Sequence, residues 1–236
     1  MNRLSLNIDL GEYPDESDEF YSLATVVNIA CGGHAGDHAS MQRALEQARL
    51  TGATIAAHPS YPDRAGFGRK TLSISPGDLL ASLLDQLLQL RGIAQNLGMT
   101  ISAVKPHGAL YHDLTTSPSF GEAFLAAVNH AFNASMVIVG PPVNAWRENV
   151  LSHGYRYWHE GFADRNYLPD GRLVPRSEPH ALITNPDDAA AQAVRLAKQG
   201  SFDTLCVHGD TPNALDVARA VRRALVNAEL LDLGNA

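Results

Sequence analysis

The sequence predicts one α/β domain built as a parallel β/α barrel, and three observations carry this prediction. Short β-rich runs alternate about seven times with longer segments of helical period. Strict alternation requires a parallel sheet, since each right-handed crossover uses a helix to return the chain. Polar segments rich in glycine and proline follow nearly every run, and a barrel gathers all such strand ends at one mouth. An open doubly wound sheet, which the alternation also permits, would gather only those near its switch point.

Taken in chain order, the strands are expected at 3–9, 25–30, 54–57, 101–105, 136–140, 155–160 and 204–208. Helices are expected near 38–51, 75–98, 118–133, 142–153, 187–199 and 212–228. The first connection, 13–24, is too short to assign. We expect residues 1–236 to form a single domain, because barrels of this kind take about 250 residues.

The helix near 75–98 has the best-marked boundaries. Ser75 can cap its amino end, and Pro76 suits its first turn. Leucines spaced at the helical period form an apolar stripe on it: Leu79, Leu80, Leu83, Leu84, Leu87, Leu88 and Leu90. Gly98 ends it, where a left-handed residue is needed to close the last turn. Gly52 and Gly200 occupy the same place after two other helices.

Composition and missing motifs exclude several classes of protein. Hydrophobic residues make up 45% of the chain, enough for a substantial core, and the net charge of -7 argues against nucleic-acid binding. No apolar signal core or lipid-compatible stretch is evident, so we expect a cytoplasmic protein that does not enter a membrane. The two cysteines, Cys31 and Cys206, cannot build a disulfide framework. A phosphate loop, a dinucleotide fingerprint and a nucleophile elbow are all absent.

Side chains able to do chemistry collect where the expected strands end. Residues two apart on a strand face the same side, so Asn7 with Asp9, Lys105 with His107, and Cys206 with His208 should point together into the top of the barrel. Five of the ten histidines follow strands in this way: His34, His58, His107, His159 and His208. Imidazoles and carboxylates together either bind a divalent metal or act as general acid and base, and both interpretations remain open.

Several strand-end residues are candidates for substrate binding. Arg64, Arg69 and Arg165 either lie on a solvated surface or grip a carboxylate or phosphate. The glycines around His34 either form a tight turn or aim backbone amides at an oxyanion. The full set of predicted substrate-binding residues is Asn7, Glu12, His34, Asp63, Arg64, Arg69, Asp164, Arg165 and Asp210.

Six motifs in order along essentially the whole chain resemble the LamB/YcsF (lactam utilisation) family. They are Asn7-Ile-Asp9-Leu-Gly-Glu12, Asn28-Ile-Ala-Cys-Gly-Gly-His-Ala-Gly-Asp37, His58-Pro-Ser-Tyr-Pro-Asp-Arg-Ala-Gly-Phe-Gly68, Val104-Lys-Pro-His-Gly-Ala-Leu-Tyr111, Glu160-Gly-Phe-Ala-Asp-Arg165 and Val207-His-Gly-Asp-Thr-Pro-Asn213. Ile8 and Lys70 depart from the family, which more often has cysteine and arginine there.

The resemblance implies both a fold and a reaction. The fold is a deformed, seven-stranded β/α barrel similar to the glycoside hydrolase and deacetylase barrels. The reaction is that of 5-oxoprolinase, which converts 5-oxoproline, ATP and water to glutamate, ADP and phosphate. Family members form the A subunit and require B and C partner subunits, which agrees with the missing phosphate loop.

In that scheme Asp9, His58, His107 and His208 are candidates for proton transfer or metal binding. Lys105 would stabilise an oxyanion or a transferred phosphate, and Glu160 is a second candidate base. The related deacetylase barrels suggest that Asp9, His58 and His107 hold a divalent metal. Two alternatives remain: a stand-alone metal-dependent amidase or deacetylase, and a non-catalytic scaffold or regulatory subunit.

Overall fold

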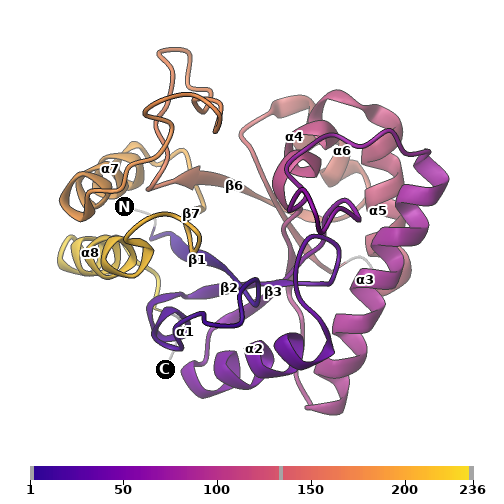
Figure 1. Cartoon of the computed structure of the whole chain (residues 1–236). Helices are drawn as coiled ribbons and strands as arrows, with labels where there is room; N and C mark the ends of the chain where they lie inside the picture. The colour runs from indigo at the N-terminus through magenta and orange to yellow at the C-terminus, as the bar shows by residue number, and fades with distance from the viewer. Residues whose placement is uncertain (1–2, 133–134, 234–236) are drawn as a thin grey trace.

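Seven parallel strands close into a barrel at the centre of the computed structural model, which describes residues 3–132 and 135–233 (Figure 1). The strands are β1 (Ser5–Leu10), β2 (Val26–Ala30), β3 (Thr54–His58), β4 (Ala103–Val104), β5 (Val137–Gly140), β6 (Arg156–Phe162) and β7 (Thr204–His208). Each strand pairs in parallel with the next, and β7 pairs with β1 to close the ring. The predicted seven-stranded β/α barrel is therefore confirmed.

Helices surround this barrel on its outer side (Figure 1). They are α1 (Glu19–Leu23), α2 (His38–Thr51), α3 (Pro76–Asn96), α4 (Gly108–Thr116), α5 (Pro118–Phe132), α6 (Asn144–Ser152), α7 (Pro186–Gln199) and α8 (Ala214–Asn227). All six expected helices are present, with ends within two residues of the prediction. The expected last residue of α5, at 133, lies outside the described residues.

The sequence did not predict α1 or α4. Helix α1 is only 5 residues long, so it has no measurable period. Helix α4 begins directly after the strand-end motif at Gly108, a residue that normally marks a loop. Gly108 has φ +60°, and a Cβ there would lie 2.3 Å from the carbonyl oxygen of Gly68, so only glycine fits. The close approach joins the start of α4 to the loop after β3.

The capping chemistry at the helix ends is as predicted. The Ser75 hydroxyl accepts from the Asp78 backbone N–H at the start of α3, and Pro76 occupies its first turn. Gly98 is left-handed at its other end. The glycines after α2 and α7, Gly52 and Gly200, are left-handed too.

Strand β4 is shorter than the sequence predicts. The ladder at β4 was expected over 101–105 but is assigned only to Ala103–Val104. Backbone N–H groups of Ser102 and Lys105 still donate to β3, and Pro106, which has no N–H, stops the ladder there.

The connection 163–185 between β6 and α7 contains no helix and stands out from the body near α7 (Figure 1).

Strand alternation divides the barrel wall into an outer and an inner face. Ile8, Val104 and Val207 are fully buried in the cluster beneath the helices, as predicted. The inner face begins with a small apolar plug of Val26, Ala56, Ala103, Val137 and Val139. Polar inner residues come next along the strands, so the side chains able to do chemistry lie at the carboxyl-terminal end of the barrel.

Within the described residues, no helix has the length and apolarity needed to cross a membrane.

Candidate functional site

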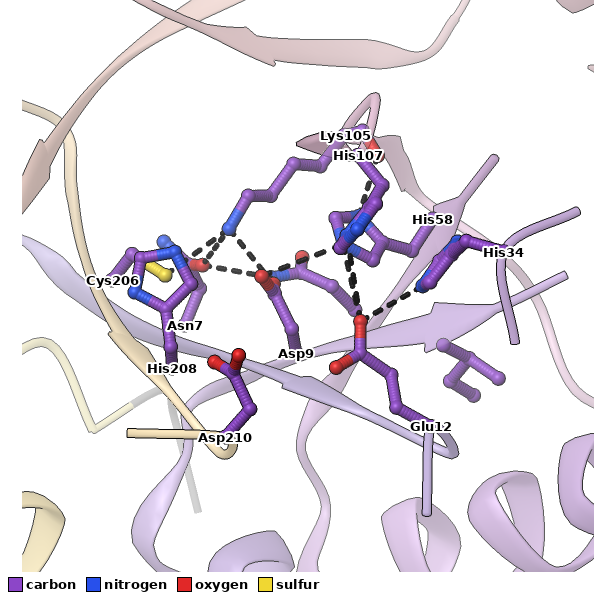
Figure 2. Close-up of polar contacts among 12 residues, drawn as sticks. Asn7, Asp9, Glu12, His34, His58, Lys105, His107, Cys206, His208 and Asp210 are labelled. Atoms are coloured by element: carbon purple, nitrogen blue, oxygen red, sulfur yellow. Dashed lines mark hydrogen bonds and ion pairs between the residues drawn. The ribbon is translucent and has the colours of Figure 1, made fainter. Parts of the chain in front are cut away.

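Side chains from several strand ends meet inside the carboxyl-terminal end of the barrel (Figure 2). Asp9 comes from β1, His58 from β3, Lys105 and His107 follow β4, and His208 ends β7. Their convergence was predicted from alternation and is observed. The first four are all less than about a tenth exposed, so the site is closed to bulk water.

Lys105 is the centre of the inner network. Its ammonium lies 2.8 Å from Asp9 Oδ1 and 2.9 Å from Glu160 Oε1. It also donates to Asn7 Oδ1 at 3.0 Å and to Cys206 Sγ at 3.2 Å. The buried cation thus has acidic partners on two strands, as a buried charge requires a partner. Glu160, predicted as a second base, is placed as a counter-charge to Lys105.

Three imidazoles and one carboxylate form a second group beside this network. The Nε2 atom of His58 lies 2.9 Å from Nδ1 of His107. Glu12 Oε1 lies 2.8 Å from Nε2 of His34 and 3.4 Å from Nδ1 of His107. Asp9 Oδ2 is 3.4 Å from Nε2 of His58, which joins the two groups. These donor atoms lie close enough together to hold a metal ion.

The metal ligands predicted by analogy were Asp9, His58 and His107. The structure keeps both histidines in the candidate group but supplies Glu12 and His34 as its other members. Asp9 is instead part of a second group, with Cys206 and His208. The carboxylate nearest the His107 donor atom is thus Glu12, which follows β1 rather than lying on it.

Burial and neighbouring charges separate the protonation states of these groups. Burial alone would raise the pKa of Asp9, but His58 and Lys105 together hold it well below its usual range. Burial alone would lower the pKa of Lys105, yet Asp9 leads the groups that raise it well above its usual range. The pKa of His107 is well below its usual range, first because of burial and then because of His34. The site thus combines a buried ion pair with a neutral imidazole.

Glu12 behaves differently from Asp9. Burial first, and then the charges of Asp9 and Asp210, raise the pKa of Glu12 well above its usual range. Burial also lowers the pKa of His34, its hydrogen-bond partner. In the arrangement shown, the Glu12–His34 contact therefore carries little net charge.

His208 is held in position by Asp164. The carboxylate accepts from the His208 backbone N–H at 2.8 Å, and both its oxygens lie 3.1 Å from His208 Nδ1. Thr211 also donates to it. A carboxylate in this place favours the tautomer with hydrogen on Nδ1, in which Nε2 of His208 is the acceptor. Asp164 was predicted to bind substrate, but its geometry is that of a positioning residue.

A ring of residues covers the mouth. The Phe67 ring packs edge-on against His34 and His107, with centroids 5.1 and 5.3 Å away. Arg69 lies over the Phe67 ring and forms an ion pair with Asp210. Arg176, from the long connection after β6, also pairs with Asp210 at 2.8 Å. Two arginines from separate loops thus share one carboxylate across the mouth.

Three predicted substrate-binding residues lie elsewhere and are already engaged. Asp63 accepts from the Gly66 backbone inside its own loop. Arg64 donates to the carbonyls of Gly32 and Gly36 and closes the turn after β2. Arg165 is buried and donates to carbonyls in the connection after β6. These contacts give the three side chains structural roles, and their binding of a substrate stays a prediction.

A cavity of about 450 Å³ opens beside the mouth. It is bordered by Tyr13, Glu16 and Phe20 from the first connection and by residues near the start of α8. None of the buried histidines lines it, because Phe67, which stacks on Tyr13, lies against the histidine cluster. The cluster and this cavity are therefore adjacent but separate.

Asn28 and Phe67 contribute to the site but were not predicted. Asn28 donates to both Asn7 and Asp9 at 2.7 Å. It lies opposite Asp9 in the strand register, so alternation along β2 could have identified it. Phe67 lies in a glycine-rich stretch with a left-handed backbone, φ 53°, and nothing in its spacing predicts its contact with His107.

Comparison with known proteins agrees with this architecture. The LamB/YcsF family model matches residues 4–231. A protein of Methylococcus capsulatus, named as the A subunit of 5-oxoprolinase, is 39% identical, covering 94% of this chain and 92% of its own. One of the same name from Carboxydothermus hydrogenoformans is also 39% identical, over 98% and 96%.

A solved structure extends the similarity to three dimensions. The lactam utilization protein from Thermus thermophilus superposes with a TM-score of 0.89 at 35% identity. The match covers 97% of this chain and 98% of that one. The family model, the relatives and the shared barrel agree, and the chain belongs to the LamB/YcsF family.

Proposed function

We propose that this chain is the A subunit of an ATP-dependent 5-oxoprolinase and that its barrel mouth is the site of lactam hydrolysis. The observation that carries the proposal is the buried Asp9–Lys105 ion pair beside the imidazoles of His58 and His107. The name that the relatives share, which contains 5-oxoprolinase, supports the substrate class. Their designation as an A subunit supports an assembly, which we propose contains B and C subunits.

The chemistry explains the need for ATP. A five-membered lactam is a stable, weakly electrophilic amide. Transfer of the γ-phosphoryl group to its oxygen makes the ring carbon electrophilic and releases ADP. Attack by water then gives a tetrahedral intermediate whose C–N bond breaks as the nitrogen gains a proton, and a second water releases phosphate from the resulting acyl phosphate to leave glutamate. ATP as cosubstrate places the proposed reaction in the cytoplasm.

The site's residues have distinct parts in this scheme. The Asp9 carboxylate, whose Oδ2 lies beside His58, can take a proton from the attacking water, while His58 and His107 supply nitrogen donors of the cluster. The Lys105 ammonium, adjacent to Asp9, stabilises negative charge on the tetrahedral carbon's oxygens. His208, held by Asp164, presents Nε2 as a second proton carrier.

The mouth provides a place for the substrate carboxylate. Arg69 and Arg176 both hold Asp210 in the structure. A carboxylate on the substrate can replace the Asp210 carboxylate between the two guanidinium groups, since the two acceptors have the same charge and shape. We propose that 5-oxoproline enters this way, with its ring directed toward His107.

A divalent metal at the cluster is compatible with this scheme. The donor set of imidazoles and a carboxylate fits such an ion, which would act as a Lewis acid on the lactam oxygen. His58 and His107 belong to the predicted ligand set and lie within this cluster.

Glutamate release with purified A, B and C subunits tests the function and separates its alternatives. We expect release that requires ATP, both partners and this chain. Turnover by the isolated chain without ATP would identify a stand-alone amidase or deacetylase instead. Release that proceeds equally well when this chain is omitted would contradict the proposal. Activity that needs the chain but survives His107→Ala would favour a scaffold.

A further inference from the structure

Two imidazoles face each other at the mouth through their inner ring nitrogens. His58 Nδ1 lies 2.7 Å from the Lys105 carbonyl oxygen, and His107 Nε2 lies 3.0 Å from that of Phe67. A carbonyl oxygen only accepts, so both of these ring nitrogens carry hydrogen. A neutral imidazole has one N–H, so the other nitrogen of each ring is a bare acceptor when that ring is neutral. These two acceptors, His58 Nε2 and His107 Nδ1, are 2.9 Å apart.

Two lone pairs at this separation repel each other inside a buried site. The arrangement is stable when a cation shares both, which means either one added proton or a metal ion. Donation of the outer N–H to a backbone carbonyl is how metal-bound histidines are oriented. Both His58 and His107 have this outer contact.

Glu12 supplies a third donor at a suitable distance. Its Oε1 lies 3.4 Å from His107 Nδ1 and 3.9 Å from His58 Nε2. Zn²⁺ bonds nitrogen at about 2.0–2.1 Å, which places two ligand atoms about 2.9 to 3.4 Å apart for bond angles between 90° and tetrahedral. Two of the three separations, 2.9 and 3.4 Å, lie at the ends of this range, and the third, 3.9 Å between Glu12 and His58, is about half an ångström longer, so ligation requires shifts of about that size.

Ring geometry excludes His34 from the same coordination sphere. The His34 and His107 rings are stacked, 3.6 Å apart and 1° from parallel. An ion bound to imidazole lies near the ring plane, so one ion cannot lie in both planes. The His58 ring is instead 89° from that of His107, which allows a shared ion.

His34 supports the site through Glu12. Its Nε2 lies 2.8 Å from Glu12 Oε1. Its Nδ1 has no hydrogen-bond partner among the described residues, whereas the outer nitrogen of a ligand histidine normally has one. Both observations fit a positioning residue that orients the Glu12 carboxylate.

We propose that Glu12 Oε1, His58 Nε2 and His107 Nδ1 bind one divalent transition-metal ion, with His34 orienting Glu12. Three protein ligands leave a position open for water or substrate, as in catalytic rather than structural zinc sites. Asp9 is not a ligand in this proposal, because it lies outside the group of donor atoms that contains both His58 and His107, and its Oδ1 is engaged by Lys105 and Asn28. Its Oδ2 remains 3.4 Å from His58 Nε2, next to the proposed ion.

Metal binding by the full chain tests this directly. The protein is stripped with a chelator and titrated with Zn²⁺ by calorimetry and with Co²⁺ by visible absorbance. We expect one ion per chain and a Co²⁺ spectrum typical of nitrogen and oxygen ligands. His107→Ala and Glu12→Gln should each weaken binding at least a hundredfold. His34→Ala should weaken it about 10- to 100-fold without changing the stoichiometry. His130→Ala, at an exposed position on α5, is the control.

Circular dichroism checks that each variant folds. If His107→Ala does not fold, His107→Gln replaces it in the titration. Failure of the folded wild-type chain to bind either ion, or equal binding by a folded His107 variant, would overturn the proposal and leave a shared proton between the two rings. The titration contains no lactam, nucleotide or partner protein. Its outcome is therefore independent of the glutamate-release result.

Discussion

The carboxylate of Asp164 fixes His208 through two separate contacts, one to its backbone N–H at 2.8 Å and one to its Nδ1 at 3.1 Å. Asp164→Asn removes the charge that selects the Nδ1–H tautomer while preserving the size of the side chain. We expect glutamate release by the complex to fall about 10- to 100-fold, as for other residues that orient a catalytic histidine. A merely structural role would leave the pH profile unchanged, so kcat/KM is measured from pH 5 to 9. An unaltered profile with wild-type kcat/KM would contradict this assignment.

Asp164 also makes stability depend on pH. Burial would raise its pKa, but the interaction with His208 and the hydrogen bonds that the carboxylate accepts hold the pKa below its usual value in the folded chain. The pKa of an aspartate in the unfolded chain is about 3.9. A carboxyl whose pKa is lower in the folded chain stabilises the fold at pH values above about 3.9. This stabilisation is lost as the pH falls through the pKa of the folded chain. Denaturant unfolding from pH 7 to pH 3 should show a smaller loss of free energy of unfolding in Asp164→Asn than in wild type. Asp15→Asn, at an exposed position, should follow wild type.

The shared carboxylate of Asp210 should hold the connection 163–185 against the mouth. Arg176 on this connection pairs with Asp210, and Arg172 beside it is exposed. Asp210→Asn removes a charge-assisted contact worth about 1.5–3 kcal/mol, so trypsin should cleave the connection about tenfold faster. Glu178→Gln, on the same connection, is the matched control. Equal cleavage rates for the wild type and Asp210→Asn would show that Asp210 does not restrain the connection.

Both cysteine thiols should be unreactive in the folded chain. Burial raises the pKa of Cys31 to about 12. Burial also raises the pKa of Cys206 well above its usual range, against the opposing charge of Lys105. A disulfide reagent at pH 8 should therefore label neither thiol before unfolding and both afterwards, because the thiolate is the reacting form. Rapid labelling of either cysteine under native conditions would contradict the closed site.

The leucine stripe of α3 should carry a large part of the stability of the barrel's outer layer. Leu87 is fully buried, and Leu87→Ala should lower the free energy of unfolding by about 2–5 kcal/mol. Leu50 on α2 is 76% exposed, and Leu50→Ala should change the free energy of unfolding by less than about 0.5 kcal/mol. Equal effects in a denaturant titration would contradict the assigned burial.

The sequence predicts the fold well because periodicity records burial on each face. The apolar neighbours Ile8 and Val207 indicate the outer face of their strands, and the polar residues between them indicate the inner face. Helix ends at Ser75 and Gly98 follow from local backbone chemistry. Helix α4 was missed because Gly108 serves a long-range contact with the loop after β3, which no local pattern shows.

The site is predicted less completely, for a related reason. Alternation brings Asp9, Lys105 and His107 together, but it does not say which atoms meet. The pairing of Arg176 with Asp210 joins loops 34 positions apart whose course depends on the whole fold. Arg64 resembles a substrate ligand in sequence, yet backbone carbonyls that only the folded turn presents occupy its guanidinium.

The most direct test of the proposed chemistry is glutamate release by a complex containing Asp9→Asn. This change preserves the shape of the side chain but removes the charge paired with Lys105 and adjacent to His58. With assembly and folding verified by size-exclusion chromatography and circular dichroism, we predict a loss of at least a hundredfold in kcat, the usual effect of removing a positioned acid–base or charge-stabilising group. Glutamate release at the wild-type rate by the assembled variant would contradict the placement of lactam hydrolysis at this barrel mouth.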